Sequence, residues 1–380
     1  QEGGTSYLSW ALGQNLFIID VDAARTCENE GEECIKSITQ VLDLGVVVNT
    51  NMPTTTYVIR GGTIYTMNGE ETIVNGTIIV TGDTIVTVGD NTVPDPQPPF
   101  QEINLNGGYV LPGFIDAHAH FSGSMTPNVV TNWGLALNLA FGVTTVHNPS
   151  ADSVSVFSDA ELVKSGKKIG PRMFSTGTII YGAGGPGHCD ISNLEAAMAH
   201  LRRLKAYGAW SVKSYQQSCR AARIHILQAA KNLNMSVVPE GGMQYYWDLS
   251  FIVDGHTTIE HNIPMAPLYN DVLTLYSASG TAYTPTFVVN FGDLQGEHWY
   301  YQHTNIWENS RLMYWAPQSS IRSQTMRPPQ AAQEDYYHFK TTAAAKDLIR
   351  RGTKVNTGAH GQMQGLGFHW ELGLFKQGNL

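Results

Sequence analysis

From residue 108 onward, strand-like runs of apolar and β-branched residues alternate with longer amphipathic stretches of helical periodicity. This alternation is typical of a parallel sheet, because a crossover helix must return the chain before each new strand. Eight such runs favour a (β/α)8 barrel of the TIM type over an open doubly wound sheet. The predicted strands are 110–120, 143–147, 172–178, 209–215, 235–240, 257–261, 282–289 and 354–357, and the clearest predicted helices are 192–207, 220–233 and 334–351.

Two β-rich parts precede this α/β region. The first combines short β segments at 16–20 and 46–48 with a polar helical stretch near 30–42. The second contains β-rich runs divided by Asn-Gly and Gly-Asp turns, which indicate a small antiparallel unit. We therefore expect three parts, which are a β-rich segment at 1–55, a small β unit at 56–107 and the barrel at 108–380.

Composition narrows the classes of partner. The net charge of −9, without a Lys/Arg-rich run, argues against nucleic acid, and no apolar run is long enough to span a bilayer. Only 14% of residues are charged, against roughly 25% in typical soluble domains. This low charge favours secretion, extensive subunit contacts, or both.

The cysteines and the chain ends leave questions open. Cys27 and Cys34 bracket a short loop, and Cys189 and Cys219 follow two different predicted strands, so each pair is either a disulfide or two free thiols. The sequence starts at Gln1 without an initiator Met and stops soon after the predicted eighth strand. We therefore expect a processed or excised piece, truncated after that strand.

The segment Leu111–His120 runs an apolar strand into two histidines that lie two residues apart. Side chains with this spacing in a strand face the same side, so His118 and His120 can hold one cation between them. The alternative is two ordinary histidines on a solvated strand. The nearly continuous apolar run before them indicates a strand covered on both faces, where polar groups need partners, and this favours a metal site.

Further polar residues lie at or near the ends of later predicted strands. In a parallel barrel these ends converge on one mouth. Lys213 is costly to bury as a free cation, so we expect its carboxylation by CO₂ or an ion pair with Glu240, with a structural lysine as the third alternative. Nitrogen and oxygen donors indicate one or two divalent ions, zinc first, with manganese, iron, cobalt or nickel open. The converging residues are Lys213, Tyr215, Glu240, His261 and His360.

From about Tyr57 onward, the chain resembles the amidohydrolase superfamily in its Pro112–His120 motif and in the turn that ends at Gly89. It is most similar to the branch in which the amidohydrolase follows a TolB-like β-propeller. The resemblance implies a small β-sandwich beside a metal-dependent barrel, a propeller remnant before residue 50, and a periplasmic or extracellular location. The similar segments are 141–150, 212–215, 239–242, 259–261 and 358–362.

Carried over by residue, the resemblance implies that His118 and His120 bind the more buried metal. It implies that Lys213 is a carboxylated bridging lysine and that His261 binds the second metal. The chain departs from the family where many members have a strand-five histidine ligand, because Glu240 stands there. We therefore expect Glu240 to act as an oxygen ligand and a candidate catalytic group.

The second departure concerns the general base. The superfamily usually ends strand eight with an aspartate that binds metal and accepts a proton from water, whereas this chain has His360. His360 is therefore a candidate metal ligand or general base. Asp116, Glu240 and Glu260 are the alternative carboxylates, and Glu260 is the weakest because strand alternation points it away from His261. Tyr215 is a candidate donor to a tetrahedral oxyanion.

Outside this set, His147 and His188 are expected to line the mouth, and the aromatic-rich connection 292–334 to form part of the substrate pocket or a subunit contact. We expect a hydrolase of amide bonds in dipeptides or N-acyl amino acids, with a metal-activated hydroxide as nucleophile. An esterase, lactonase or phosphotriesterase would use the same site. An inactive amidohydrolase-like subunit of an assembly is the alternative from another class, and a homo-oligomer or larger assembly is expected in either case.

Overall fold

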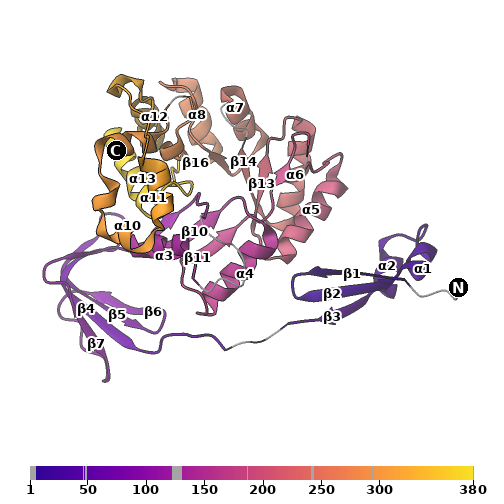
Figure 1. The fold of residues 1–380 in the computed structure, drawn as a ribbon, viewed down its shortest axis with the longest axis horizontal. Helices are drawn as coiled ribbons and strands as arrows, with labels where there is room; N and C mark the ends of the chain where they lie inside the picture. Colours follow the sequence, from indigo (N-terminus) through magenta and orange to yellow (C-terminus); the bar gives the residue numbers. More distant parts are fainter. Residues whose placement is uncertain are drawn as a thin grey trace.

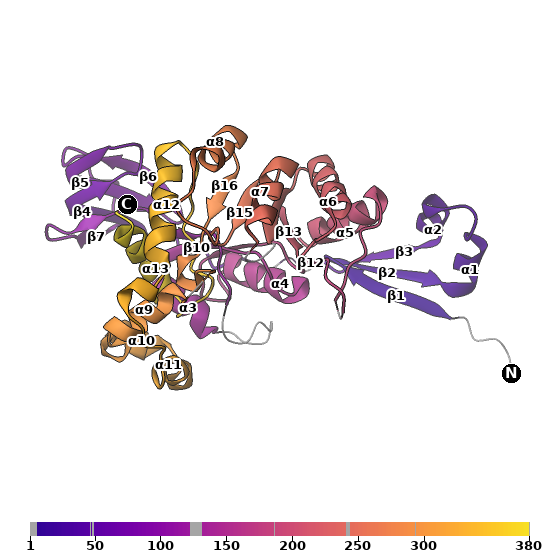
Figure 2. The same ribbon diagram turned by 90° about the horizontal axis from the view of Figure 1, so that it is seen from above.

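The computed structural model describes residues 6–45, 47, 49–121, 131–185, 187–240, 244–292 and 294–379. A central set of parallel strands is surrounded by helices, and two β-rich units lie at opposite ends of the molecule (Figure 1, Figure 2). Among these residues, no helix is both long enough and apolar enough to cross a membrane.

The N-terminal unit is a three-stranded antiparallel sheet with two short helices beside it. A disulfide between Cys27 and Cys34 joins the helices. The helix predicted up to residue 42 ends at Ile38, because the chain then pairs with β2 as a strand. Residues 46 and 48 of the predicted strand 46–48 lie outside the described residues. The elements are β1 (Tyr7–Leu12), β2 (Asn15–Asp20), α1 (Val21–Thr26), α2 (Glu32–Ile38) and β3 (Gln40–Asp43).

The second unit is a mixed sheet with the strand order β6-β5-β4-β7. Its first three strands are antiparallel neighbours, as predicted. The predicted unit ended at the Pro-rich loop, and after that loop β7 and β8 add to the sheet in parallel with β4. The strands are β4 (Thr56–Tyr65), β5 (Thr72–Thr81), β6 (Thr84–Gly89), β7 (Gln101–Asn104) and β8 (Tyr109–Val110).

The rest of the chain is a mixed α/β fold in which the strands pair in parallel. Three sheets have the orders β11-β10-β9, β12-β13-β14 and β15-β16. Tyr283 of β16 bridges in parallel to Val355, and the Ala117 amide donates to the Thr357 carbonyl at 2.9 Å, which links the last segment to the first. The strands are β9 (Phe114–Asp116), β10 (Val143–Asn148), β11 (Arg172–Ser175), β12 (Ile180–Tyr181), β13 (Ser211–Tyr215), β14 (Ser236–Glu240), β15 (Thr258–Glu260) and β16 (Ala282–Thr284).

Helices cover these strands with their apolar faces. On α5, Ala197, Leu201 and Leu204 are fully buried at helical spacing, and the Asn193 side chain caps the helix by accepting the Ala196 amide. The predicted helices 192–207 and 220–233 are confirmed, and α12 starts later than predicted, at His338. The covering helices are α3 (Trp133–Ala140), α4 (Ser153–Lys164), α5 (Leu194–Ala206), α6 (Arg220–Leu233), α7 (Tyr245–Asp254), α8 (Asn270–Ser279), α12 (His338–Arg350) and α13 (Leu366–Gln377).

Several predicted strands are too long. The run 110–120 contains only β8 and the short β9, and 354–357 contains only the bridge at Val355. The second half of 282–289 is the 3-10 helix η1 (Phe287–Val289), because the Glu371 carboxylate accepts its first two amides and withdraws them from strand pairing. The connection 292–334 is largely helical. Its elements are α9 (Gly296–His303), η2 (Ile306–Glu308), α10 (Ser310–Trp315), α11 (Gln318–Thr325) and η3 (Gln333–Asp335), the last of which extends just past it.

Candidate metal centre

Four imidazoles gather where the parallel strands end. The ring centroids of His118 lie 5.2 Å from His120, 4.8 Å from His261 and 5.1 Å from His360. The donor atoms of His118, His120 and His360 lie within 4.8 Å of one another, and so do those of His118, Glu240 and His261. The structure therefore brings together the five His and Glu residues that the sequence predicts as metal ligands, in two overlapping groups.

Backbone hydrogen bonds, rather than strand alternation, place the first two histidines. β9 ends at Asp116, so His118 and His120 lie beyond it. One oxygen of Asp116 accepts the amides of His118 and Ala359, both at 3.1 Å. The side chain of Asp116 is buried, which raises its pKa to about 7. Asp116 thus joins the first and last segments of the ring, and its role as an alternative base stays a prediction.

His261 and His360 both adopt left-handed backbone conformations, with φ of +69° and +57°. Such conformations are uncommon for residues with a side chain and are often found at functional sites. The His360 amide donates to the His118 carbonyl at 2.6 Å. Gly361 follows with φ of +80°, and a Cβ there would lie 2.2 Å from the His120 carbonyl oxygen. Only glycine allows the chain to pass this close to the histidine pair.

Three of the four imidazoles have the Nδ1 atom engaged by a different polar group. Nδ1 of His118 lies 2.5 Å from Glu260 Oε2, and Nδ1 of His120 lies 3.1 Å from Asn148 Oδ1. Nδ1 of His261 lies 2.6 Å from Thr286 Oγ1. When Nδ1 donates its proton, Nε2 carries the free lone pair, which is the form that ligates a metal.

Some buried nitrogen atoms in the cluster have no hydrogen-bond partner among the described residues. These atoms are Nε2 of His118 and Nδ1 of His360. A buried polar atom without a partner is costly, so such atoms in one cluster require an explanation. Neutral imidazole nitrogens beside a carboxylate form a donor set that suits a borderline divalent ion such as zinc.

Lys213 and Glu240 form a buried ion pair beside the imidazoles. They come from the paired strands β13 and β14, in which Tyr215 lies opposite Glu240. The other oxygen of Glu240 lies 3.3 Å from His261 Nε2. Burial raises the pKa of Glu240, but the hydrogen bond and charge of His261 and the charge of Lys213 outweigh this effect and lower it well below its usual range.

The surroundings keep His118, His120 and His360 neutral. Burial lowers the pKa of His118 well below its ordinary value, with a further contribution from His261. Burial and Lys213 lower the pKa of His120 to about 4, and burial and His261 lower that of His360 to about 2. Neutral imidazoles are ready to bind a cation without first losing a proton.

Tyr215 lies at the edge of this group. Its ring centroid is 5.1 Å from the Lys213 ammonium nitrogen and 5.6 Å from the ring of Tyr181. Burial and the nearby Glu240 raise the pKa of Tyr215, so the phenol keeps its proton and can donate it in a hydrogen bond.

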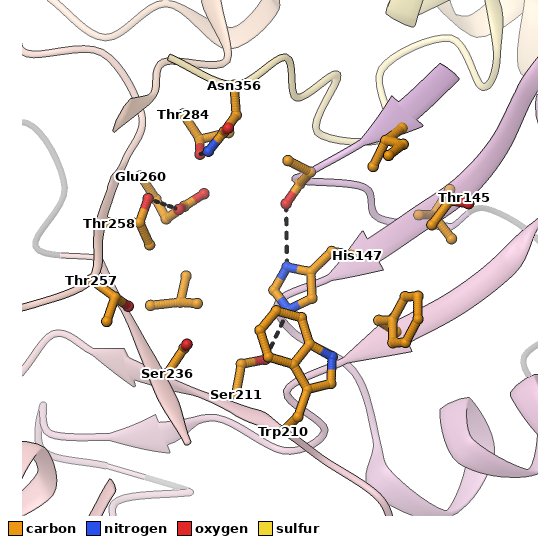
Figure 3. A pocket seen from close by; sticks show the side chains of 15 residues that line it. Thr145, His147, Trp210, Ser211, Ser236, Thr257, Thr258, Glu260, Thr284 and Asn356 are labelled. Carbon is orange, nitrogen blue, oxygen red and sulfur yellow. Dashed lines mark hydrogen bonds between the residues drawn. The ribbon is translucent and has the colours of Figure 1, made fainter. Parts of the chain in front are cut away.

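On the far side of Glu260 is a pocket of about 420 Å³ lined by residues of successive strands (Figure 3). Most of its labelled side chains carry hydroxyl groups. His147 lies here, and not at the mouth as predicted, with Nδ1 3.2 Å from the Ala117 carbonyl and Nε2 2.9 Å from Ser211 Oγ. His188 is exposed in its loop, and Cys189 and Cys219 are free thiols.

The sequence does not identify the groups that contact the histidines from outside the cluster. Glu260 was expected to point away from His261, yet it contacts His118, and the rings of His118 and His261 lie 4.8 Å apart. Alternation fails because β15 ends at Glu260 and His261 turns into a left-handed conformation. Asn148 and Thr286 were missed as well, although each lies at or just beyond a strand end. That position was their only signal in the sequence.

No protein-family model matches the chain, and no curated protein matches it. Solved structures do match. An Xaa-Pro dipeptidase with bound methionine is 18% identical, covers 86% of this chain and 84% of its own, and gives a TM-score of 0.61. The A. niger ochratoxinase is 16% identical over 85% and 81% of the two chains (TM-score 0.57), and bottromycin amidohydrolase is 17% identical over 86% and 74% (TM-score 0.60). The chain therefore has the fold of solved dipeptidase and amidohydrolase structures.

Proposed function

We propose that this protein is a metal-dependent hydrolase that cleaves amide C–N bonds in dipeptides or N-acyl amino acids. The single observation that carries the proposal is the convergence of four imidazoles and Glu240, with buried nitrogens of His118 and His360 that have no hydrogen-bond partner among the described residues. The solved structures with this fold that are named as a dipeptidase and amidohydrolases support the choice of amide substrates.

A (β/α)8 barrel is the architecture that we propose to carry this site. Two observations support it. Neighbouring strands pair in parallel, and the hydrogen bond from the Ala117 amide to the Thr357 carbonyl links the last segment to the first. We propose residues 56–107 as the accompanying β-sandwich and residues 1–55 as the end of a TolB-like propeller. The separate sheets of these two parts support the division, and the propeller assignment rests on sequence resemblance alone.

His118, His120 and His360 would hold one divalent ion, and His118, Glu240 and His261 mark the position of another. We propose zinc, because the donors are imidazole nitrogens and carboxylate oxygens. A bound divalent ion lowers the pKa of a water molecule and polarises the scissile carbonyl. The protein supplies fixed donors, and their outer partners hold each ring in its orientation.

Lys213 has two proposed states. In the structure its ammonium group pairs with Glu240, which leaves the other oxygen of Glu240 directed at His261. Carboxylation by CO₂ would convert the lysine into a bridging anionic ligand. That state would place two anions side by side, so it requires cations on both sides of the bridge.

We assign proton transfer to residues of the cluster and of its edge. We propose that neutral His360 or Glu240 accepts the proton of the attacking water, because each belongs to one of the two candidate ligand groups. Tyr215 keeps its proton and is placed beside Lys213, so it donates a hydrogen bond to the oxygen that becomes negative in the transition state.

We also propose that the protein is exported and assembles with copies of itself or with other subunits. The Cys27–Cys34 disulfide and the low fraction of charged residues support export to the periplasm or the extracellular space. The exposed apolar side chains of Tyr7, Leu8 and Val41 on the first sheet support an assembly contact.

Elemental analysis and a substrate panel test the proposed function together. We expect one or two equivalents of zinc per chain, and hydrolysis of at least one dipeptide or N-acyl amino acid that stops when a chelator removes the metal. Hydrolysis of esters or phosphotriesters without any amide would reassign the substrate class. A chain that binds no metal and cleaves no amide would contradict the proposal and support the inactive subunit.

A further inference from the structure

The Glu260 side chain lies between two environments. It is almost fully buried, and one oxygen lies 2.5 Å from His118 Nδ1. The other oxygen accepts a hydrogen bond from the Thr258 hydroxyl at 2.8 Å. Figure 3 shows the carboxylate at the wall of the pocket, near Thr284 and Asn356 and on the opposite side of the space from His147. Glu260 is therefore in contact with a candidate ligand while its far side faces a space lined by hydroxyl groups.

The partner of Nδ1 differs among the three histidines. His118 contacts a carboxylate, His120 contacts the amide oxygen of Asn148, and His261 contacts the hydroxyl of Thr286. The contact of His118 with Glu260, at 2.5 Å, is the shortest of the three, against 3.1 Å for His120 and 2.6 Å for His261. A short contact of this kind to an outer partner fixes the orientation of a ligating ring.

His118 is also the histidine that the two candidate ligand groups share. Its ring is completely buried, so it cannot turn toward solvent to find another partner. A rotation of this ring would remove a donor from both groups at once. Control over its orientation therefore has more effect than control over His120 or His261, each of which belongs to one group.

We propose that Glu260 is the positioning residue of the metal centre, which fixes the His118 ring so that Nε2 faces the ion. This inference rests on the proposed function, since it assumes that the histidine cluster binds a divalent ion. Glu260 does not touch the ion or the substrate. It acts through His118, and the Thr258 hydroxyl holds it in place.

The test is the affinity of the metal-free full-length protein for Zn²⁺ alone, measured by competition with a coloured chelator. Glu260→Gln keeps the shape of the side chain but replaces one of its two acceptor oxygens by an amide NH₂ group, so the side chain can no longer accept from Thr258 and His118 through separate oxygens. We expect it to weaken Zn²⁺ binding about 10- to 100-fold. Thr258→Val removes only the hydroxyl that supports Glu260, and a smaller loss is expected. The matched control is Glu371→Gln, because Glu371 is an equally buried carboxylate that accepts the amides of Phe287 and Val288. It should leave Zn²⁺ affinity unchanged.

The possible results distinguish a failure of the positioning role from a failure of the proposed function. If the parent protein and Glu260→Gln bind Zn²⁺ equally well, the positioning role is wrong and the metal site stands. If Glu371→Gln weakens binding as much as Glu260→Gln, the effect is a general one of buried carboxylates and the inference also fails. If the parent protein binds no Zn²⁺, the proposed function and the inference fail together.

A second measurement needs no variant, so it remains decisive if Glu260→Gln does not fold. In the zinc-loaded parent protein labelled with ¹⁵N-histidine, we expect His118 to be ligated through Nε2, with a deshielded and slowly exchanging proton on Nδ1. Ligation of His118 through Nδ1 would place the ion where Glu260 now lies and would overturn the inference.

Discussion

The parallel strands carry one group of polar side chains at their ends and another around the pocket, and the two groups have different surroundings. Toward the strand ends lie the histidine cluster, Lys213 and Glu240, and buried ring nitrogens there lack partners among the described residues. In the other half, the polar groups around the pocket bind one another. His147 uses both ring nitrogens, and the Asn356 amide donates to Thr284 at 3.3 Å. Both halves are polar, and they differ in whether their buried polar atoms have hydrogen-bond partners.

This comparison gives a criterion for recognising ligand histidines. His118 lies just beyond β9, and His147 lies in the neighbouring parallel strand β10. His118 has one nitrogen engaged and the other without a partner among the described residues, whereas His147 has both engaged. A histidine with a single outer partner is oriented for a ligand role, and one with two partners is a structural element of the fold.

The largest expected effect separates these two histidines directly. His118→Ala removes the donor shared by both ligand groups, so we expect bound metal and hydrolysis to fall to background. His147→Gln keeps a polar side chain in the pocket and should retain the metal content of the parent protein. Elemental analysis of both variants checks the comparison. Equal loss of metal in the two would show that the halves of the strands are not functionally distinct.

The next largest effect concerns the buried ion pair. Glu240→Gln leaves the Lys213 ammonium buried without its counter-charge, and we expect the metal-free protein to lose about 3–5 kcal/mol of unfolding free energy. Urea denaturation of chelator-treated protein measures this loss. The double variant Lys213→Met with Glu240→Gln should recover much of the stability. A single variant as stable as the parent would mean that the pair is open to solvent.

Acid stability provides a smaller difference. Burial lowers the pKa of His147 to about 4, below its ordinary value of 6.5. The unfolded chain therefore takes up a proton first as the pH falls, and the stability contributed by neutral His147 is lost between about pH 6.5 and 4, by about 3 kcal/mol. Unfolding of metal-free His147→Gln across this range should show a shallower acid decline than the parent. Identical slopes would contradict the assignment of a neutral, buried His147.

The smallest effect is expected on the pocket wall. Ser236 lines the pocket and is only partly buried, so Ser236→Ala should change the unfolding free energy by less than about 0.5 kcal/mol. Its Zn²⁺ affinity should equal that of the parent. A large change in affinity would extend the metal centre into the half of the strands that we describe as structural.

The order of strands and helices was predictable because it depends on local periodicity. The helices α5 and α6 match their predicted ranges closely, since their apolar positions recur at helical spacing. The strand lengths were less predictable. β9 is shorter than the apolar run around it. The run after β16 turns at Thr286, because the distant Glu371 carboxylate accepts the amides of Phe287 and Val288.

The candidate ligands were predictable from residue type and from their position after strands. Their outer partners were not. Glu260, Asn148 and Thr286 lie 142, 28 and 25 residues from the histidines that they contact, and none of these separations forms a motif. The disulfide Cys27–Cys34 was one of two open alternatives, and the free state of Cys189 and Cys219 depends on where their loops lie.

The sequence by itself determined the α/β alternation and the set of His, Lys and Glu residues available for a metal centre. These follow from side-chain chemistry and from spacing along the chain. Only the tertiary structure decided which nitrogen of each histidine is free and which carboxylate faces which ring. Those choices depend on left-handed turns at His261 and His360 and on contacts between distant strands, and the energy of a buried polar group is set by its neighbours in space.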